Sequence, residues 1–298
     1  MTAKNNQKIK RGIILIFLSS LMFGTYGVWS KLIGDSFGSL YQAWTRAAII
    51  FLILLPILYF TKQIVHIQKK DWKWMTIFLI FTSGTQAPIF YAFNHMDIGT
   101  ATLLFFTTML LTMYIVGFIF LKEKLSKIKI VSFLTAVAGL YFMFSFSLEK
   151  FTLLAASMAV LNGIASGGEV SISKKLTNSY SALYLTALSW LIIVPTNGLI
   201  SLMIGEKQIV PSLNLVWVWQ LCYTITALLA FWLIIEGLKY VEASIGGLIG
   251  LLEIIFSIGF GIIIFGEKLT PKIAIGATLI LLAASLPHLK QLSENETN

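Results

Sequence analysis

Charged residues are scarce in this sequence, and their scarcity excludes most soluble proteins. Only 12% of the 298 residues are charged, whereas 57% are hydrophobic, and an average globular domain has about 25% charged residues. A soluble protein of this size needs more polar side chains to cover its surface. We therefore expect lipid to cover most of the outside of the molecule.

Groups that carry redox, metal or catalytic chemistry are also missing. Cys222 is the single cysteine, so neither a disulfide framework nor a redox pair can form. His66, His95 and His288 are scattered at the ends of apolar runs or in loops, which is not a metal-site pattern. There is no P-loop, Ser/His/Asp grouping or paired-Asp motif. The sequence therefore predicts no enzyme, no cofactor and no metal.

The net charge of +9 could indicate nucleic acid, but its distribution indicates a membrane. Lys and Arg lie in short loops between apolar runs, without a basic helix or an aromatic stacking motif, so we expect no nucleic acid partner. They are concentrated on one side of the expected bilayer, which predicts cytoplasmic termini in a bacterial plasma (inner) membrane. The opposite side has only Lys31, Lys150, Lys207, Lys268 and Lys272.

Long apolar runs fill the rest of the chain. A helix needs about 20 apolar residues to cross the hydrocarbon core. Ten stretches qualify, and their short connections predict antiparallel neighbours. They are approximately 12–33, 39–60, 73–94, 98–121, 128–147, 151–173, 181–204, 214–238, 242–265 and 271–289. We read the first as a retained helix and not as a cleaved signal peptide.

The two halves of the chain share a pattern at a separation of 144 residues. This separation aligns Glu123 with Glu267, each in a Glu-Lys-Leu-(Ser/Thr) signature, and also Gly24 with Gly168. The simplest account is a repeat of five spans. Because five is odd, the second copy enters the membrane in the opposite sense, a recurring construction in transporters. We predict an all-α membrane protein with ten transmembrane helices in two inverted five-helix repeats, residues 1–148 and 149–298.

Short motifs in a specific order extend over nearly the whole chain. They are Phe23-Gly24-Thr25-Tyr26-Gly27-Val28-Trp29-Ser30-Lys31, Ala43-Trp44-Thr45-Arg46-Ala47-Ala48, Tyr91-Ala92-Phe93, Gly237-Leu238-Lys239-Tyr240, Leu251-Leu252-Glu253 and the two Glu-Lys-Leu signatures. In these motifs the chain resembles the ten-helix EamA-type branch of the drug/metabolite transporter superfamily.

This resemblance implies secondary transport of amino acids, amines or similar metabolites, often as export, with a central cavity between the repeats. The sequence also departs from the family pattern. The proline usual in the middle of spans four and nine is replaced by Met109 or Leu110 and by Ile254, and Phe23 stands where Trp is common. Helix kinks at the two proline positions therefore have no support from the sequence.

Three ionisable residues fall inside the expected spans, where charge is costly and usually functional. Glu169 is a candidate for substrate binding or proton coupling; the alternative is an interfacial Glu paired with Lys174 or Lys175. Glu253 is a candidate proton carrier; its alternative is a structural ion pair, conceivably with Arg46. Arg46 could hold a substrate carboxylate, but the resemblance places an arginine here whatever the substrate, which favours an architectural role.

Polar and aromatic residues of the spans complete the candidate substrate site. Gln86 precedes Pro88, which frees a backbone carbonyl and kinks the helix. Asn162 lies seven residues before Glu169, on the same helix face. The other candidates are aromatic and could form a cavity wall: Tyr26, Trp29 and Tyr91.

The sequence thus predicts a secondary transporter of small polar metabolites that works by alternating access, with protons as a candidate coupling ion. Two alternatives remain open. A quaternary ammonium or other cation permease would place Glu169 in a cavity walled by aromatic rings. A non-transporting membrane subunit would lack a midplane cavity. A homodimer is compatible with the sequence, which determines neither the substrate nor the transport direction.

Overall fold

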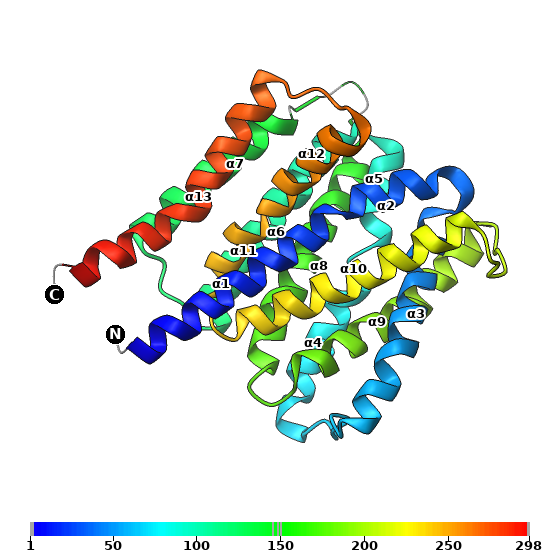
Figure 1. Ribbon diagram of the computed structural model, residues 1–298, viewed down its shortest axis with the longest axis horizontal. Coiled ribbons are helices and arrows are strands. Elements are labelled where there is room, and N and C mark those ends of the chain that lie inside the picture. Colours follow the sequence, from blue (N-terminus) through cyan, green and yellow to red (C-terminus); the bar gives the residue numbers. More distant parts are fainter. Residues whose placement is uncertain (1–2, 145, 148, 150, 297–298) are drawn as a thin grey trace.

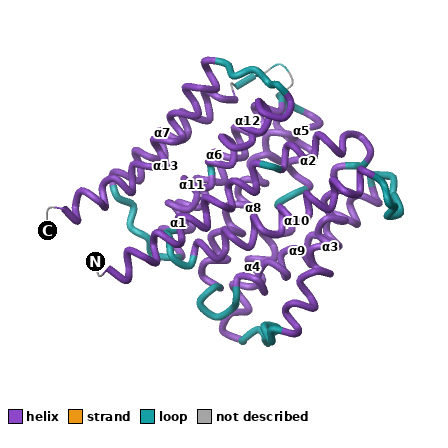
Figure 2. Tube along the Cα trace, viewed as in Figure 1, coloured by secondary structure: helices purple, strands orange, loops and turns teal. Residues whose placement is uncertain are grey.

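The protein folds as a bundle of helices in this computed structural model (Figure 1). The backbone is described for residues 3–144, 146–147, 149 and 151–296, and the side chains for 6–144, 146–147, 149 and 151–287. Lys150 and residue 148, the predicted end of the first half, lie outside the described residues, as does the side chain of His288. Within the described backbone every regular element is helical, and none is a strand (Figure 2).

The described residues form ten spans, and three of these are broken into two helices. The first half contains α1 (Ala3–Gly24), α2 (Tyr26–Ile33), α3 (Ser39–Phe60), α4 (Trp72–Ser83), α5 (Ala87–His95), α6 (Ile98–Phe120) and α7 (Lys127–Phe144). The second contains α8 (Leu153–Leu176), α9 (Ala182–Met203), α10 (Leu215–Leu238), α11 (Ala243–Gly250), α12 (Leu252–Phe265) and α13 (Pro271–Glu296). Short 3₁₀ turns, Gly34–Ser36 and Lys69–Asp71, precede α3 and α4.

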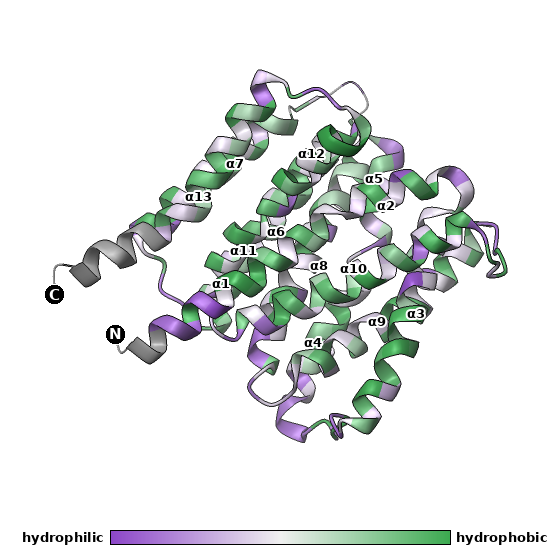
Figure 3. Ribbon diagram, in the orientation of Figure 1, coloured by the Kyte–Doolittle hydropathy of each residue, from purple (hydrophilic) through white to green (hydrophobic). Residues whose placement is uncertain are grey.

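These helices have the length and composition of membrane spans. Among the described residues, nine stretches are long and apolar enough to cross a bilayer, and a shorter apolar helix, Pro271–Pro287, is the tenth. Large apolar side chains such as Leu52, Phe118 and Ile263 are exposed on the outside. Hydrophobic residues cover the lengths of the helices, and hydrophilic ones gather at their ends (Figure 3). The molecule is a multi-pass membrane protein.

The helices pack as two inverted repeats. Equivalent helices of the two halves meet each other: α3 packs against α9, and α7 packs antiparallel against α13 (Figure 1). Other contacts occur in matched pairs. Helix α6 packs on α8, and the equivalent helix α12 of the second half packs on α1, the equivalent of α8. We call the face where α1 begins and α13 ends the inner face, and the opposite one the outer face.

Glycines set the close approach of α7 and α13. A Cβ atom at Gly139 would lie 2.9 Å from the Gly276 carbonyl oxygen, and one at Gly276 would lie 2.6 Å from that of Gly139. Small residues allow helix backbones to approach closely in membranes. This reciprocal contact relates the two halves directly.

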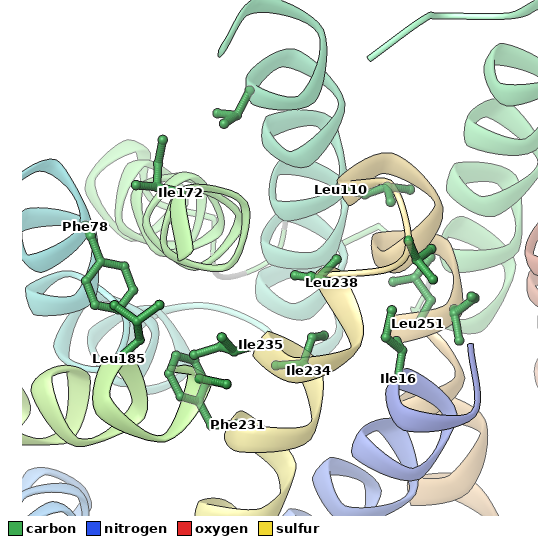
Figure 4. Packing of buried hydrophobic residues seen from close by; sticks show 14 of the residues in the cluster. Ile16, Phe78, Leu110, Ile172, Leu185, Phe231, Ile234, Ile235, Leu238 and Leu251 are labelled. Carbon is green, nitrogen blue, oxygen red and sulfur yellow. The ribbon is translucent and has the colours of Figure 1, made fainter. Parts of the chain in front are cut away.

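An apolar core fills the inner part of the bundle. Ile16 of α1, Leu110 of α6 and Leu251 between α11 and α12 are 0% exposed, and their side chains gather between these helices (Figure 4). In Figure 4, Leu238, Ile234 and the other labelled side chains continue this cluster through α10 toward α4, α8 and α9. The core therefore joins the two repeats.

The three breaks occur in only one member of each repeat pair. The first span breaks at Thr25, the third at Gly84–Gln86 and the ninth at Leu251, whereas their equivalents α8, α10 and α6 are continuous. The ninth span breaks beside Ile254 although the family's usual proline is missing there. The break follows Gly246, Gly247 and Gly250, which form much of α11 and are poor helix formers.

Candidate functional site

Arg46 lies at the centre of the bundle within a group of aromatic rings. It is on α3 and is 2% exposed. Its guanidinium carbon lies 4.0 Å from the ring centroid of Tyr223, 5.6 Å from that of Tyr26 and 5.8 Å from that of Trp190. Rings at such distances stabilise a cation that water does not reach. We call these three rings the aromatic cage.

The cage leaves polar atoms without partners. The Arg46 Nε, the Tyr26 hydroxyl and the Trp190 Nε1 are buried and make no hydrogen bond within the described part of the chain. Arg46 also forms no ion pair with any described carboxylate. The alternative in which Arg46 and Glu253 form a structural ion pair is therefore not seen among the described residues. Buried donors without partners are unusual in proteins and often mark a place where a ligand or water binds.

Glu169 lies on α8, buried between two hydroxyl groups. It is 4% exposed, and its Oε1 accepts hydrogen bonds from Thr82 Oγ1 of α4 at 2.8 Å and from Ser189 Oγ of α9 at 2.5 Å. Both bonds end on Oε1, and Oε2 has no protein partner among the described residues. One carboxylate oxygen is thus fixed, and the other can accept a proton or a ligand donor.

The alternative reading of Glu169 as an interfacial partner of nearby lysines is wrong. Lys174 forms an ion pair with Glu123 at 3.0 Å. The Lys175 ammonium lies 3.9 Å from the ring centroid of Trp74. Glu169 is held by hydroxyls from two other helices and not by either cation.

Asn162 contacts the break in the third span, which includes Gln86. Asn162 is 1% exposed, and its Nδ2 donates to the Gly84 carbonyl oxygen at 3.1 Å. Gln86 has non-helical backbone angles (φ −126°, ψ −65°) and precedes the helix that begins at Ala87. Asn162 therefore satisfies a carbonyl that the break leaves without a helical partner, while Gln86 is half-buried beside it.

Glu253 occupies the first turn of α12, next to the break in the ninth span. It is half-buried and makes no hydrogen bond or ion pair within the described residues. A Cβ atom at Gly24 would lie 3.1 Å from the Glu253 carbonyl oxygen, so the first-span break packs directly against the ninth-span break.

The remaining aromatic candidates lie toward the outer face. The Trp29 Nε1 donates to Thr25 Oγ1 at 3.0 Å, and its ring stacks on Trp219 with centroids 6.1 Å apart. Tyr91 stacks on His95 at 4.0 Å near the end of α5, in a small apolar cluster separate from the one around Tyr26. Trp29 is thus close to the first-span break, whereas Tyr91 lies in a different part of the bundle.

The repeat relates the two charged centres. Helices α3 and α9 begin at Ser39 and Ala182 and end at Phe60 and Met203, a constant offset that makes Arg46 and Ser189 equivalent. The offset between Gly24 and Gly168 likewise makes Thr25 equivalent to Glu169. The Thr25 hydroxyl of the first repeat is thus replaced by the Glu169 carboxylate in the second. The Arg46 guanidinium is replaced by the Ser189 hydroxyl.

Sequence reasoning missed several residues that hold this site together. Thr82 and Ser189 orient Glu169, and Tyr223 and Trp190 surround Arg46. Each lies on a different helix from its partner, and a lone hydroxyl or ring in an apolar span is an ordinary feature. The equivalence of Ser189 with Arg46 follows from the helix bounds and not from the sequence offset of 144 residues. No group of three or more His, Cys, Asp or Glu residues in the described regions is placed to hold a metal ion.

Comparison with known proteins agrees with this architecture. Twenty-nine chains of solved structures match this one. One of them, described only as "Crystal structure of protein", aligns with a TM-score of 0.73 and 15% sequence identity, over 93% of this chain and 97% of its own. At that identity the likeness concerns the fold. A search of the curated proteins finds no match.

The family comparison covers both halves of the chain. The sequence model of the EamA-like transporter family matches residues 10–145 and again residues 153–286. Its two matches correspond to the two five-span bundles, each with one of the Glu-Lys-Leu signatures. The family is one of membrane transporters and not of enzymes. This chain belongs to the EamA-like transporter family, within the drug/metabolite transporter superfamily.

Proposed function

We propose that this protein is a secondary transporter of small polar metabolites that works by alternating access between its inverted halves. The observation that carries the proposal is a set of three ionisable residues inside the spans: Arg46 beside Tyr26, Glu253 where the breaks of spans one and nine meet, and the buried Glu169. Ionisable groups inside a membrane protein are costly and mark substrate or ion pathways. Transporters with inverted repeats bind substrate near the midplane, at such broken helices.

Each residue has a distinct role in this proposal. Glu169 binds a substrate donor or the coupling proton through its free Oε2, because Thr82 and Ser189 hold Oε1. Glu253, without a protein partner, is the second candidate for proton coupling. Tyr26 and Trp29 form the aromatic wall of the site. Asn162, Gln86 and the break of the third span supply polar groups beside them.

The substrates that fit best are amino acids, amines or related compounds, moved in the direction of export. A permease for quaternary ammonium or other cations would be favoured by aromatic rings around Glu169. The rings instead surround Arg46, the protein's own cation, and Glu169 is held by hydroxyls. This arrangement supports a substrate with both donor and acceptor groups over a purely cationic one.

The membrane and its sides also belong to the proposal. We place the protein in a bacterial plasma membrane with the inner face cytoplasmic, because the lysine-rich loops of the first half lie at this face. The N- and C-terminal ends lie at this same face (Figure 1). The lipid bilayer and the solute are the expected partners, and the number of subunits is open to experiment.

A thermal-shift screen followed by flux measurement tests the proposal. Amino acids, polyamines, choline-like amines and nucleosides are screened for stabilisation of the purified protein, and positive compounds are tested for flux in proteoliposomes. We expect saturable flux of at least one class, faster with a pH gradient than without one. Transport is contradicted if no stabilising compound crosses the membrane faster than in empty liposomes. Flux that ignores the gradient would contradict proton coupling alone.

A further inference from the structure

One buried carboxylate at the inner face joins three spans. Glu123 lies between α6 and α7 and is 7% exposed. It accepts hydrogen bonds from the backbone N–H groups of Ala243 (2.6 Å) and Ser244 (3.2 Å), which begin α11, and from Ser244 Oγ (3.0 Å). The Lys174 ammonium at the end of α8 lies 3.0 Å from the same carboxylate. We call this group the inner latch.

The latch combines several favourable electrostatic contacts. The N-terminus of a helix carries partial positive charge and unpaired N–H groups, both of which favour an anion. Lys174 also donates to the Val241 carbonyl oxygen at 2.7 Å, which fixes it beside α11. Burial by itself raises the pKa of Glu123, but Lys174 and the hydrogen bonds at α11 outweigh burial, so that this pKa lies below its ordinary value.

The second repeat contains the same local structure around Glu267. The Glu123 N–H donates to the Gly117 carbonyl at 2.9 Å, and the Glu267 N–H donates to the Gly261 carbonyl at 3.2 Å. In both loops the carboxylate lies over that glycine, where a Cβ atom would clash with it. The two Glu-Lys-Leu signatures therefore form the same turn in each half of the chain.

The two carboxylates nevertheless have different partners. Glu267 contacts Lys31 at 3.0 Å, in a pair whose side chains are 54% (Lys31) and 55% (Glu267) exposed. By the offset of 144 residues, the equivalent of the α11 N-terminus is the start of α6 at Gly99 and Thr100. There the Thr100 N–H is bound by Asp97 Oδ1 at 2.9 Å, and not by Glu267.

Helix packing follows the same asymmetry. At the inner face α11 packs against α1, α6, α7, α8 and α10, which closes the seam between the halves. At the outer face α12 packs against α1, α2 and α13, and within the described residues it does not pack closely against α5 or α6. The structure therefore has a latched inner face and an unlatched outer face.

We propose that Glu123 is the latch of the inner gate and that Glu267 is its counterpart for the outer gate. When the inner face opens, Glu123 leaves the start of α11, and Glu267 binds the start of α6 at Gly99 and Thr100 in place of Asp97. Each state of the cycle then has one carboxylate bound at a helix N-terminus and one exposed. This inference rests on the proposed alternating-access function.

The repeat also selects two reporter positions. Ser30 is exposed at the outer face and is the equivalent of Lys174, so it becomes covered when the outer latch closes. Met113 is 1% exposed, at the seam of α6 with Gly247 of α11. Its equivalent in the second half is Ser257, which is half-buried, so Met113 becomes accessible when the inner latch opens.

Cysteine accessibility tests the latch. Ser30→Cys and Met113→Cys are each made in a Cys222→Ser background and labelled with a water-soluble maleimide in nanodiscs, which expose both faces. With Glu123→Gln, we expect labelling at position 113 to accelerate by about tenfold, the factor that a charge-assisted hydrogen bond typically supplies, and labelling at position 30 to slow by a smaller factor, because the outer-open state is the major one. Lys174→Gln should change both labelling rates in the same direction. It replaces Glu123→Gln in the test if that variant does not fold.

Glu267→Gln is the matched control, because it removes the same group from the repeat-equivalent turn. It should leave labelling at position 30 unchanged and slow labelling at position 113, because Glu267 is the carboxylate proposed to hold the inner-open state. Unchanged labelling in a folded Glu123→Gln or Lys174→Gln variant overturns the latch, as does an equal response to Glu267→Gln. Failure of the transport proposal is distinct, because it is measured as the absence of solute flux and not as labelling.

Discussion

Glu169 accepts a hydrogen bond from Ser189, the residue that occupies in the second repeat the position of Arg46 in the first. Two helices of common origin thus present a hydroxyl on one side of the pseudo-symmetric site and a guanidinium on the other. A duplicated bundle with identical residues in both halves would place like charges close together, which is unfavourable where water is excluded. The divergence of this one pair gives the site both signs of charge.

Replacing Glu169 should abolish coupled transport and preserve the fold. Glu169→Gln keeps the size of the side chain and an oxygen that can accept from Thr82 and Ser189, but it removes the titratable oxygen. We expect flux of the identified substrate to fall at least tenfold, since hydrogen bonds to charged groups contribute about 1.5–3 kcal/mol. Proteoliposome flux with and without a pH gradient measures this. Wild-type rates in Glu169→Gln would remove Glu169 from the mechanism.

The aromatic cage predicts a stability effect that is specific to Arg46. Arg46→Met removes the charge and leaves the rings of Tyr223, Tyr26 and Trp190 in place. We expect a loss of about 2 kcal/mol, the range for a desolvated cation–π contact, seen as a lower unfolding midpoint in detergent. Arg11 lies over the Tyr240 ring at 5.4 Å but is exposed, so Arg11→Met is the control and should have little effect. Equal midpoint shifts in both variants would contradict the stabilising role.

Close packing of α6 on α8 predicts that Gly167 tolerates no side chain. A Cβ atom there would lie 2.4 Å from the Met109 carbonyl oxygen, which is backbone and cannot rotate away. Gly167→Ala should destabilise the protein by about 1–3 kcal/mol through overpacking. Gly259→Ala, with nothing within 4 Å of the new Cβ, should be neutral or stabilising. Thermal unfolding compares the two variants, and equal midpoints would contradict this packing.

The break in the third span depends on Asn162. Asn162→Ala leaves the Gly84 carbonyl without its hydrogen bond in a water-poor interior, and such bonds contribute about 1–2 kcal/mol in membranes. We expect a lower unfolding midpoint and slower flux, because the break positions Gln86 and Thr82. Asn94→Ala changes an exposed amide on α5 and should leave both quantities unchanged. A wild-type midpoint and flux in Asn162→Ala would show that the break does not need this bond.

Glu123 predicts a pH dependence of stability with a definite sign. The pKa of Glu123 is lower in the folded protein than in the unfolded chain. Its contribution to the free energy of unfolding is therefore fully present above the ordinary carboxyl pKa and is lost as pH falls through the lower, folded pKa. The nearby charged groups are Lys174 and the pair of Lys129 with Glu242, whose charged atoms lie 2.5 Å apart. The difference in unfolding midpoint between wild type and Glu123→Gln should be largest near pH ~7 and should shrink as pH falls below the ordinary carboxyl pKa of about 4.3. A difference that grows toward acid would contradict this assignment.

The residues of the site were only partly predictable. Glu169 and Arg46 could be found because an ionisable residue stands out in an apolar span, whatever the packing around it. The alternative in which Arg46 pairs with Glu253 is not seen among the described residues, because aromatic rings lie around the guanidinium. Tyr91 stacks on His95, four residues on along the same helix, but the helices against which this face packs depend on tertiary structure.

The sequence by itself determined the membrane class, the ten spans and their inverted order. Hydropathy and an odd number of spans per repeat are local or countable properties, and the bilayer admits few backbone solutions. Only the tertiary structure decided that three spans break, that aromatic rings and not a carboxylate surround Arg46, and that Glu123 is bound while Glu267 is exposed. Those outcomes depend on ångström-scale contacts between helices far apart in the chain. The two Glu-Lys-Leu signatures, for example, have different partners in the two halves.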